Sequence, residues 1–141
     1  MINSRKIEDL HPYVAKLCKS FVAAARKQGI DVLVTSTYRD HESQGALYAQ
    51  GRTKAGRIVT NAKPGQSFHN YRLAFDFVPI VNGKAIWNDQ RTFVKLGELG
   101  ESFGLEWAGR WKSFPEYAHL QATGGLSLAQ LRAGKKPVFP T

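Results

Sequence analysis

The chain has 141 residues, of which 43% are hydrophobic and 22% charged, which suits one folded domain and argues against a disordered chain. No apolar run approaches the roughly 18 to 20 residues of a membrane-spanning helix, so we expect no stable membrane insertion. Residues 1–8 lack the apolar core of a signal peptide, which predicts that the protein is made and kept in the cytoplasm.

Lys and Arg outnumber Asp and Glu by 20 to 11, which gives a formal net charge of +9. Such a charge favours an anionic partner: nucleic acid, a membrane surface or a polymer of the cell envelope. The basic residues are scattered, and the sequence carries no helix-turn-helix, zinc-finger or RNA-recognition signature. We therefore predict no nucleic-acid binding and expect an anionic cell envelope as the partner.

The N-terminal part of the chain predicts a helix followed by a strand. Apolar residues recur at helical spacing through residues 7–28, with the regular part beginning at Pro12, and Gly29 suits the C-terminal stop. Cys18 is the only cysteine and falls on the apolar face of this helix, so we expect a buried thiol without an internal disulfide. Residues 31–38 are rich in β-branched side chains, which predicts a strand.

The remaining chain predicts short helices mixed with short strands. Asn82-Gly83 between two apolar runs is the strongest short hairpin signal. No repeat or linker is visible, so we predict one α+β domain over residues 1–141, with a small, largely antiparallel sheet packed against helices and no separate cell-wall-binding domain. The expected elements are helices over 41–50, 89–103 and 128–133, strands over 73–81, 84–87, 105–108 and 117–121, and loops over 52–66 and 111–115.

A histidine and an aspartate, His69 and Asp76, lie close to the start of the strand predicted over 73–81. Asp76 stands in an apolar run, and burying a bare carboxylate is costly unless it is paired, hydrogen-bonded or bound to a metal. Successive side chains of a strand point to opposite faces, and this strand parity allows Asp76 and His119 to converge if their strands are neighbours. His69 could complete the trio. Three protein ligands with an open fourth position suit a catalytic zinc site on the sheet. The alternative is an Asp–His hydrogen bond in a core, with an unrelated turn histidine.

For other polar residues, spacing alone does not decide between a functional and a structural role. Glu116 precedes His119 by three positions and follows Pro115, so it can lie on a loop before the strand. On a loop, its side chain need not point away from His119 as it would on an ideal strand. A solvated carboxylate is the alternative for Glu116. Arg39 and Gln44 flank a strand-to-helix turn, and a surface salt bridge is the alternative for Arg39.

The motifs, taken together, resemble the zinc D-Ala-D-Ala carboxypeptidase and L-alanyl-D-glutamate peptidase family, and in particular its bacteriophage endolysins. The resemblance covers nearly the whole chain, and several separated motifs in the right order make it more specific than either histidine motif alone. They are Ser36-Thr37-Tyr38-Arg39, Leu47-Tyr48, Gly51-Arg52-Thr53, Ser67-x-His69-x-x-x-x-Ala74-x-Asp76, Gly104-Leu105-Glu106-Trp107, Glu116-x-x-His119, Gly125-Leu126-Ser127 and Leu131-Arg132-Ala133-Gly134.

The resemblance implies a role for each matching residue. His69, Asp76 and His119 would bind Zn²⁺. Glu116 would be the general base, and Arg39 would stabilise developing negative charge or hold the substrate. The predicted substrate-binding residues are Arg39, Gln44 and Ser67.

Three positions depart from the pattern of the family. Arg72 stands where the family usually has glycine, Glu116 stands where many endolysins carry aspartate, and Leu120 replaces a more usual aromatic residue. None of the three departures removes a ligand.

The resemblance implies a zinc-dependent peptidoglycan endopeptidase, an endolysin that cuts the L-alanyl–D-glutamate bond of the stem peptide and lyses the host cell. The alternatives are a D-Ala-D-Ala carboxypeptidase or dipeptidase, and a non-catalytic zinc-binding module of the same fold, as in Hedgehog signalling domains. We expect a monomer, cytoplasmic in the infected host, that reaches the wall after another protein permeabilises the membrane.

Overall fold

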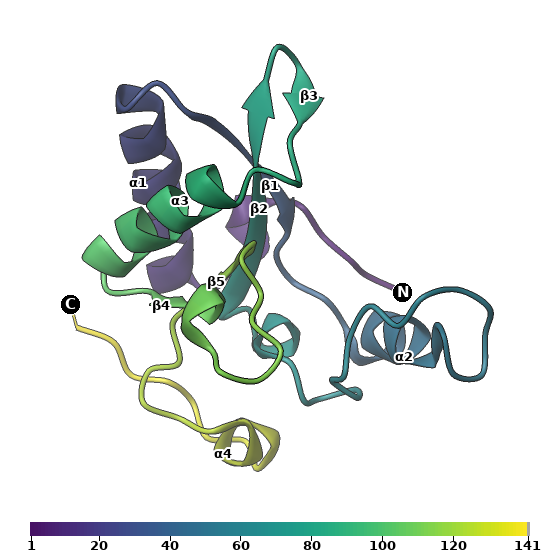
Figure 1. Cartoon of the computed structure of the whole chain (residues 1–141). Helices are drawn as coiled ribbons and strands as arrows, with labels where there is room; N and C mark the ends of the chain where they lie inside the picture. The colour runs from purple at the N-terminus through teal and green to yellow at the C-terminus, as the bar shows by residue number, and fades with distance from the viewer. Residues whose placement is uncertain (141) are drawn as a thin grey trace.

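An open antiparallel sheet lies at the centre of the computed structural model, which describes residues 1–140 (Figure 1). Four strands follow the order β1-β2-β5-β4, and β3 pairs with the end of β2 as the predicted hairpin. This arrangement confirms the α+β class with a small antiparallel sheet. The strands are β1 (Asp31–Ser36), β2 (Ala74–Val81), β3 (Lys84–Ala85), β4 (Glu106–Trp107) and β5 (His119–Gln121).

Two long helices, α1 (Pro12–Lys27) and α3 (Gln90–Ser102), cover one face of the sheet (Figure 1). The shorter α2 (His41–Ala49) and α4 (Leu128–Arg132) lie away from these two helices, at other sides of the molecule. Three 3₁₀ turns complete the described elements: η1 (Ile7–Asp9), η2 (Phe68–Tyr71) and η3 (Ala108–Arg110).

The core forms between the long helices and the sheet. The ring of Phe21 on α1 packs on Phe75 and Phe77 of β2, and the rings of Phe77 and Phe93 of α3 lie 5.8 Å apart. Cys18 is fully buried in the same cluster, as predicted, and burial raises the pKa of its thiol to about 12.

Alternation along the strands separates this core from the opposite face of the sheet. Phe75 and Phe77 point toward the helices, so Asp76 between them points the other way. On β5, Leu120 packs on α3, where a Cβ added at Gly100 would lie 2.6 Å from its side chain. Leu120, one of the departures from the family pattern, thus belongs to the core. The face opposite α1 and α3 carries the polar residues of β2 and β5.

The main differences from the predicted elements lie next to this polar face. The first strand ends at Ser36 instead of residue 38, after a register shift between Val34 and Ser36. The backbone beyond it pairs with the N-terminus, where Thr37 N donates to Ser4 O at 2.8 Å. The last strand begins at His119 instead of residue 117. Among residues 1–140, none of the helices combines the length and hydropathy needed to cross a membrane.

Arg72 occupies a left-handed backbone conformation, with φ 66°, at the end of η2. This explains why glycine suits the position, since a side chain there costs roughly 1–2 kcal/mol. The Arg72 side chain makes two contacts that glycine could not make. Its Nη1 donates to Asp9 O at 2.7 Å, and its guanidinium lies 3.9 Å from the centroid of the Tyr38 ring.

We expect Arg72→Gly to be more stable than Arg72→Ala by about 1 kcal/mol, because both variants lose the same contacts and only glycine relieves the backbone strain. Urea unfolding of the two variants measures the difference. Equal free energies of unfolding would contradict the expected advantage of glycine at this position.

Candidate active site

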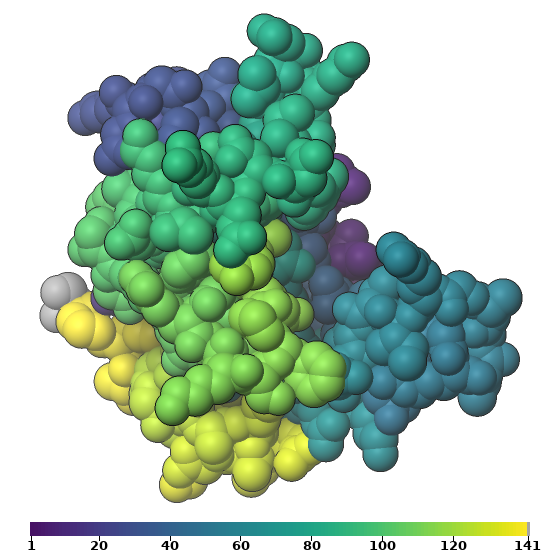
Figure 2. Space-filling view, in the orientation of Figure 1, coloured from purple at the N-terminus to yellow at the C-terminus, as the bar shows by residue number. Residues whose placement is uncertain are grey.

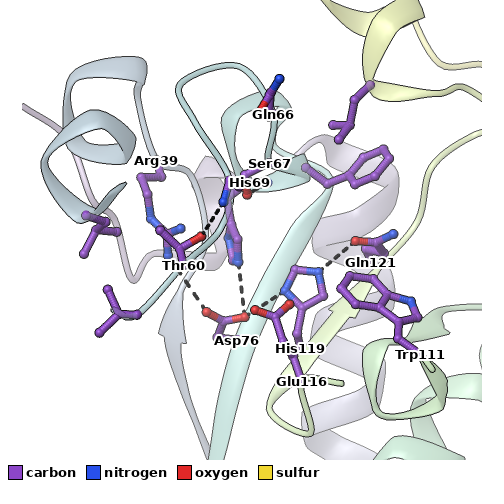
Figure 3. Close-up of a pocket in the computed structure, with 15 residues that line it drawn as sticks. Arg39, Thr60, Gln66, Ser67, His69, Asp76, Trp111, Glu116, His119 and Gln121 are labelled. Atoms are coloured by element: carbon purple, nitrogen blue, oxygen red, sulfur yellow. Dashed lines mark hydrogen bonds and ion pairs between the residues drawn. The ribbon is translucent and has the colours of Figure 1, made fainter. Parts of the chain in front are cut away.

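Two histidines and one aspartate converge on the face of the sheet opposite α1 and α3 (Figure 3). Asp76 on β2 lies directly opposite His119 on β5, and His69 comes from η2 just before β2. Asp76 Oδ1 lies 3.1 Å from His69 Nε2 and 3.0 Å from His119 Nδ1. One ligand atom from each of the three residues lies within 4.8 Å of the others, so the predicted convergence is present.

Hydrogen bonds on the outer side of each ring orient the two imidazoles. His69 Nδ1 lies 2.8 Å from the carbonyl oxygen of Thr37, which can only accept, so this nitrogen carries the hydrogen. His69 Nε2 is left as the nitrogen that faces Asp76. His119 Nε2 lies 2.8 Å from Gln121 Oε1, and His119 Nδ1 faces Asp76. Two ring nitrogens and a carboxylate oxygen turned to one point fit a divalent metal with three protein ligands and an open position.

The electrostatics of the group are dominated by the central carboxylate. Burial opposes the charge on Asp76, but the charges and hydrogen bonds of His69 and His119 outweigh it and hold the pKa of Asp76 below its ordinary value. Asp76 is therefore ionised at neutral pH, as a metal ligand must be. Burial alone would lower the pKa of His119, but its hydrogen bond to Asp76 and the charges of Asp76 and Glu116 raise it above the ordinary value. A proton and a metal ion compete for His119, so metal affinity falls as the pH falls.

Arg39 stands beside this group with its guanidinium fixed on two sides. Arg39 Nη1 donates to Gln44 Oε1 and Nη2 donates to Ser36 Oγ, each at 3.0 Å. Arg39 Nη2 also lies 3.9 Å from Asp76 Oδ2, and only 11% of the Arg39 side chain is exposed. Burial lowers the pKa of Arg39, opposed by the charges of Asp76 and Glu116. A cation is thus held next to His69, Asp76 and His119.

Gln44 is not positioned for its predicted contact with substrate. Gln44 belongs to α2, its side chain is fully buried, and both ends of its amide are bound within the protein. The oxygen accepts from Arg39, and Nε2 donates to Ala62 O at 2.8 Å. Gln44 therefore orients Arg39 and holds the loop that precedes η2. The sequence correctly placed Gln44 near Arg39. It did not predict that Gln44 would lie on the buried face of its helix.

A groove of about 400 Å³ passes over His69, Asp76 and His119. Figure 2 shows α2 and the loop after it standing apart from the rest of the molecule, with a hollow between them and the segment that leads into β5. Glu116 and Ser67 both line the groove, as does Arg39 (Figure 3). Glu116 is exposed and is not one of the three residues that could together hold a metal ion, while Ser67 Oγ accepts from His69 N at 3.3 Å.

Three residues of the site were missed by sequence reasoning. Gln121 contacts His119, Glu106 contacts Gln121, and Trp111 lines the groove with its ring centroid 5.7 Å from that of His119. Strand parity already placed Gln121 on the face of His119, so this residue could have been found. Glu106 and Trp111 depend on the pairing of β4 with β5, which the sequence does not show.

Comparison with known proteins gives matches over most of the chain. The family model of VanY, D-alanyl-D-alanine carboxypeptidase, matches residues 7–119. Peptidoglycan L-alanyl-D-glutamate endopeptidase CwlK of Bacillus subtilis (strain 168) is 42% identical over 122 residues, which cover 80% of this chain and 73% of that protein. The L-alanyl-D-glutamate peptidase of Listeria phage A118 is 34% identical over 118 residues, which cover 77% of this chain and 38% of that protein.

Two solved structures share the fold. One is the L-Ala D-Glu endopeptidase ChiX of Serratia marcescens, with a TM-score of 0.63 and 20% identity over 83% of both chains. The other is a Zn(II) complex of the vancomycin-resistance D,D-pentapeptidase VanY, with a TM-score of 0.64 and 20% identity over 86% of this chain and 82% of that chain. From the family match over residues 7–119 and the identity to CwlK, the chain belongs to the VanY family of D-alanyl-D-alanine carboxypeptidases and related peptidoglycan peptidases.

Proposed function

We propose that this chain is a zinc-dependent peptidoglycan endopeptidase that hydrolyses the L-alanyl–D-glutamate bond of the stem peptide. The observation that carries the proposal is the convergence of His69, Asp76 and His119 in one groove with Glu116 and Arg39. The names of CwlK and of the phage peptidase, which are 42% and 34% identical to this chain, support the choice of bond.

The donor set of two imidazole nitrogens and one carboxylate oxygen supports zinc as the metal. Zinc held by His69, Asp76 and His119 supplies Lewis acidity, which polarises a carbonyl group and brings the pKa of water toward about 7. The chain's own side chains supply the rest of the chemistry and the orientation of the substrate.

Glu116 acts as the general base and then as the general acid. It accepts a proton from the attacking water and returns it to the nitrogen of the leaving amine. The water oxygen bonds to the carbonyl carbon of L-Ala, and the bond from that carbon to the D-Glu nitrogen breaks. One water is consumed, and one carboxylate and one amine are released. The exposed position of Glu116 at the groove supports this role.

Arg39 stabilises the negative charge that develops on the carbonyl oxygen. Its guanidinium is held by Gln44 and Ser36 before any substrate arrives, so little reorganisation is needed during the reaction. Ser67 lines the groove and contributes to binding the peptide.

The protein acts as a monomeric endolysin that causes host cell lysis, and the phage relative supports this role. It stays in the cytoplasm of the infected host until another protein permeabilises the membrane. The net charge of +9 supports attraction to the anionic cell envelope.

A D-Ala-D-Ala carboxypeptidase is the second candidate, because the family model carries that description. The same three ligands would serve hydrolysis of either bond, so the reaction products must distinguish the endopeptidase from the carboxypeptidase. Mass spectrometry of defined peptidoglycan after digestion should show peptides with a new N-terminal D-Glu and L-Ala left on the glycan. Free D-Ala, with the L-Ala–D-Glu bond intact, would overturn the proposal in favour of the carboxypeptidase.

A further inference from the structure

A row of polar side chains crosses the face of the sheet opposite α1 and α3, from the proposed metal ligands to β4. Asp76 faces His119 across the β2–β5 pairing, Gln121 lies two residues further along β5, and Glu106 faces Gln121 across the β5–β4 pairing. Their neighbours in sequence point the opposite way, since Leu120 packs on α3 in the core. Because alternate residues share a face, the four polar side chains are brought side by side by strand register alone.

The hydrogen bonds along this row have a fixed direction. Gln121 Nε2 donates to Glu106 Oε2 at 3.0 Å, and this carboxylate oxygen is the acceptor. The Gln121 oxygen is therefore the end that faces His119, at 2.8 Å from Nε2. An acceptor at that place requires the hydrogen of His119 to sit on Nε2, which leaves the lone pair of Nδ1 for a metal. Gln121 and His119 are only 2% and 6% exposed, so water does not compete for this bond.

Glu106 is in turn held by a hydrogen bond from Trp111, a residue that lines the groove. Its Oε2 also accepts from Trp111 Nε1 at 3.1 Å, and Trp111 lines the groove beside Glu116. The backbone of Glu116 donates to Ala108 O at 3.1 Å, which closes the loop between η3 and β5. The row thus connects a metal ligand to the loop that carries the general base.

We propose that Gln121 and Glu106 are positioning residues that hold His119 with Nδ1 turned toward the metal and anchor that ligand to Trp111. The inference rests on the zinc site of the proposed function and adds two residues that act through His119. A residue that orients a ligating histidine in this way typically contributes 10- to 100-fold to metal affinity.

The row allows a charge swap as a test. Gln121→Glu places two carboxylates side by side. Glu106→Gln replaces a carboxylate by an amide that can present either its oxygen or its nitrogen to Gln121, so the orientation of the Gln121 amide is no longer fixed. In the double variant Glu106→Gln/Gln121→Glu, the carboxylate at position 121 accepts from His119 Nε2, and the amide at position 106 donates to that carboxylate and accepts from Trp111. Every donor and acceptor of the row regains a partner.

The experiment measures the zinc dissociation constant of the full chain by competition with a chromophoric chelator. Each single variant should bind zinc about 10- to 100-fold more weakly. The double variant should recover most of that loss, and its cobalt absorption spectrum should match that of the wild type. Glu98→Gln, which removes the same charge from an exposed position on α3, should bind zinc as the wild type does.

Single variants that bind zinc like the wild type would overturn the inference. A double variant whose loss of zinc affinity equals the combined losses of the two single variants would also overturn it. So would a double variant that recovers thermal stability but not zinc affinity. The bond that is cut does not enter this measurement. Failure of the L-Ala–D-Glu assignment and failure of this inference are therefore separate results.

Discussion

Replacing Glu116 by glutamine is expected to leave the chain folded and zinc-loaded, while its rate of peptide-bond cleavage falls about 10²-fold or more. Glutamine keeps the shape of the side chain but cannot take a proton from water. Glu116 is exposed at the groove and lies outside the group of metal-binding donors, so neither the core nor the ligand set should change. Zinc content by elemental analysis and turnover on soluble stem peptides measure the two effects separately.

Two further variants make this test specific. Glu8→Gln removes the same charge from an exposed site on η1, far along the chain from the groove, and should keep full activity. Glu116→Asp keeps a carboxylate one methylene further from the substrate, so its rate should fall between those of the wild type and Glu116→Gln. Near-normal turnover by a folded, zinc-loaded Glu116→Gln protein would remove Glu116 from the mechanism.

The convergence of Asp76 and His119 could be predicted because it needs only strand parity and one correct pairing. A carboxylate between Phe75 and Phe77 indicates a strand with one apolar and one polar face, and the register of β2 and β5 places Asp76 opposite His119. The helix periodicity of α1 and the hairpin at Asn82-Gly83 are local patterns of the same kind, and both are present in the structure.

The rest of the site depends on contacts between distant segments. Arg39 is positioned by Gln44 and Ser36, and the register shift that brings Ser36 opposite Asp76 has no sequence signal that we can identify. Glu106 gains its place only when the two-residue β4 pairs with β5. Short strands and helix rotations are decided by tertiary packing, so a single sequence does not predict the contacts they make.

Replacing His119 by alanine should abolish zinc binding and peptidase activity together. The substitution removes one of three donors and leaves Asp76 with His69 and Arg39 alone. Loss of a direct ligand should exceed the roughly 10- to 100-fold loss in affinity that follows removal of a supporting residue. Zinc binding to the native state alone stabilises it by about 2.7 kcal/mol when free zinc is 100 times the dissociation constant.

We therefore expect added zinc to raise the free energy of unfolding of the wild type and to leave that of His119→Ala unchanged. The comparison with and without zinc is made for each protein, so any loss of stability in the metal-free variant cancels. His41→Ala is the matched control, because His41 is an exposed histidine at the start of α2 and its removal should preserve the full effect of zinc. A His119→Ala protein that is stabilised by zinc as strongly as the wild type would remove His119 from the ligand set, and with it the reason for the hydrogen-bonded row behind it.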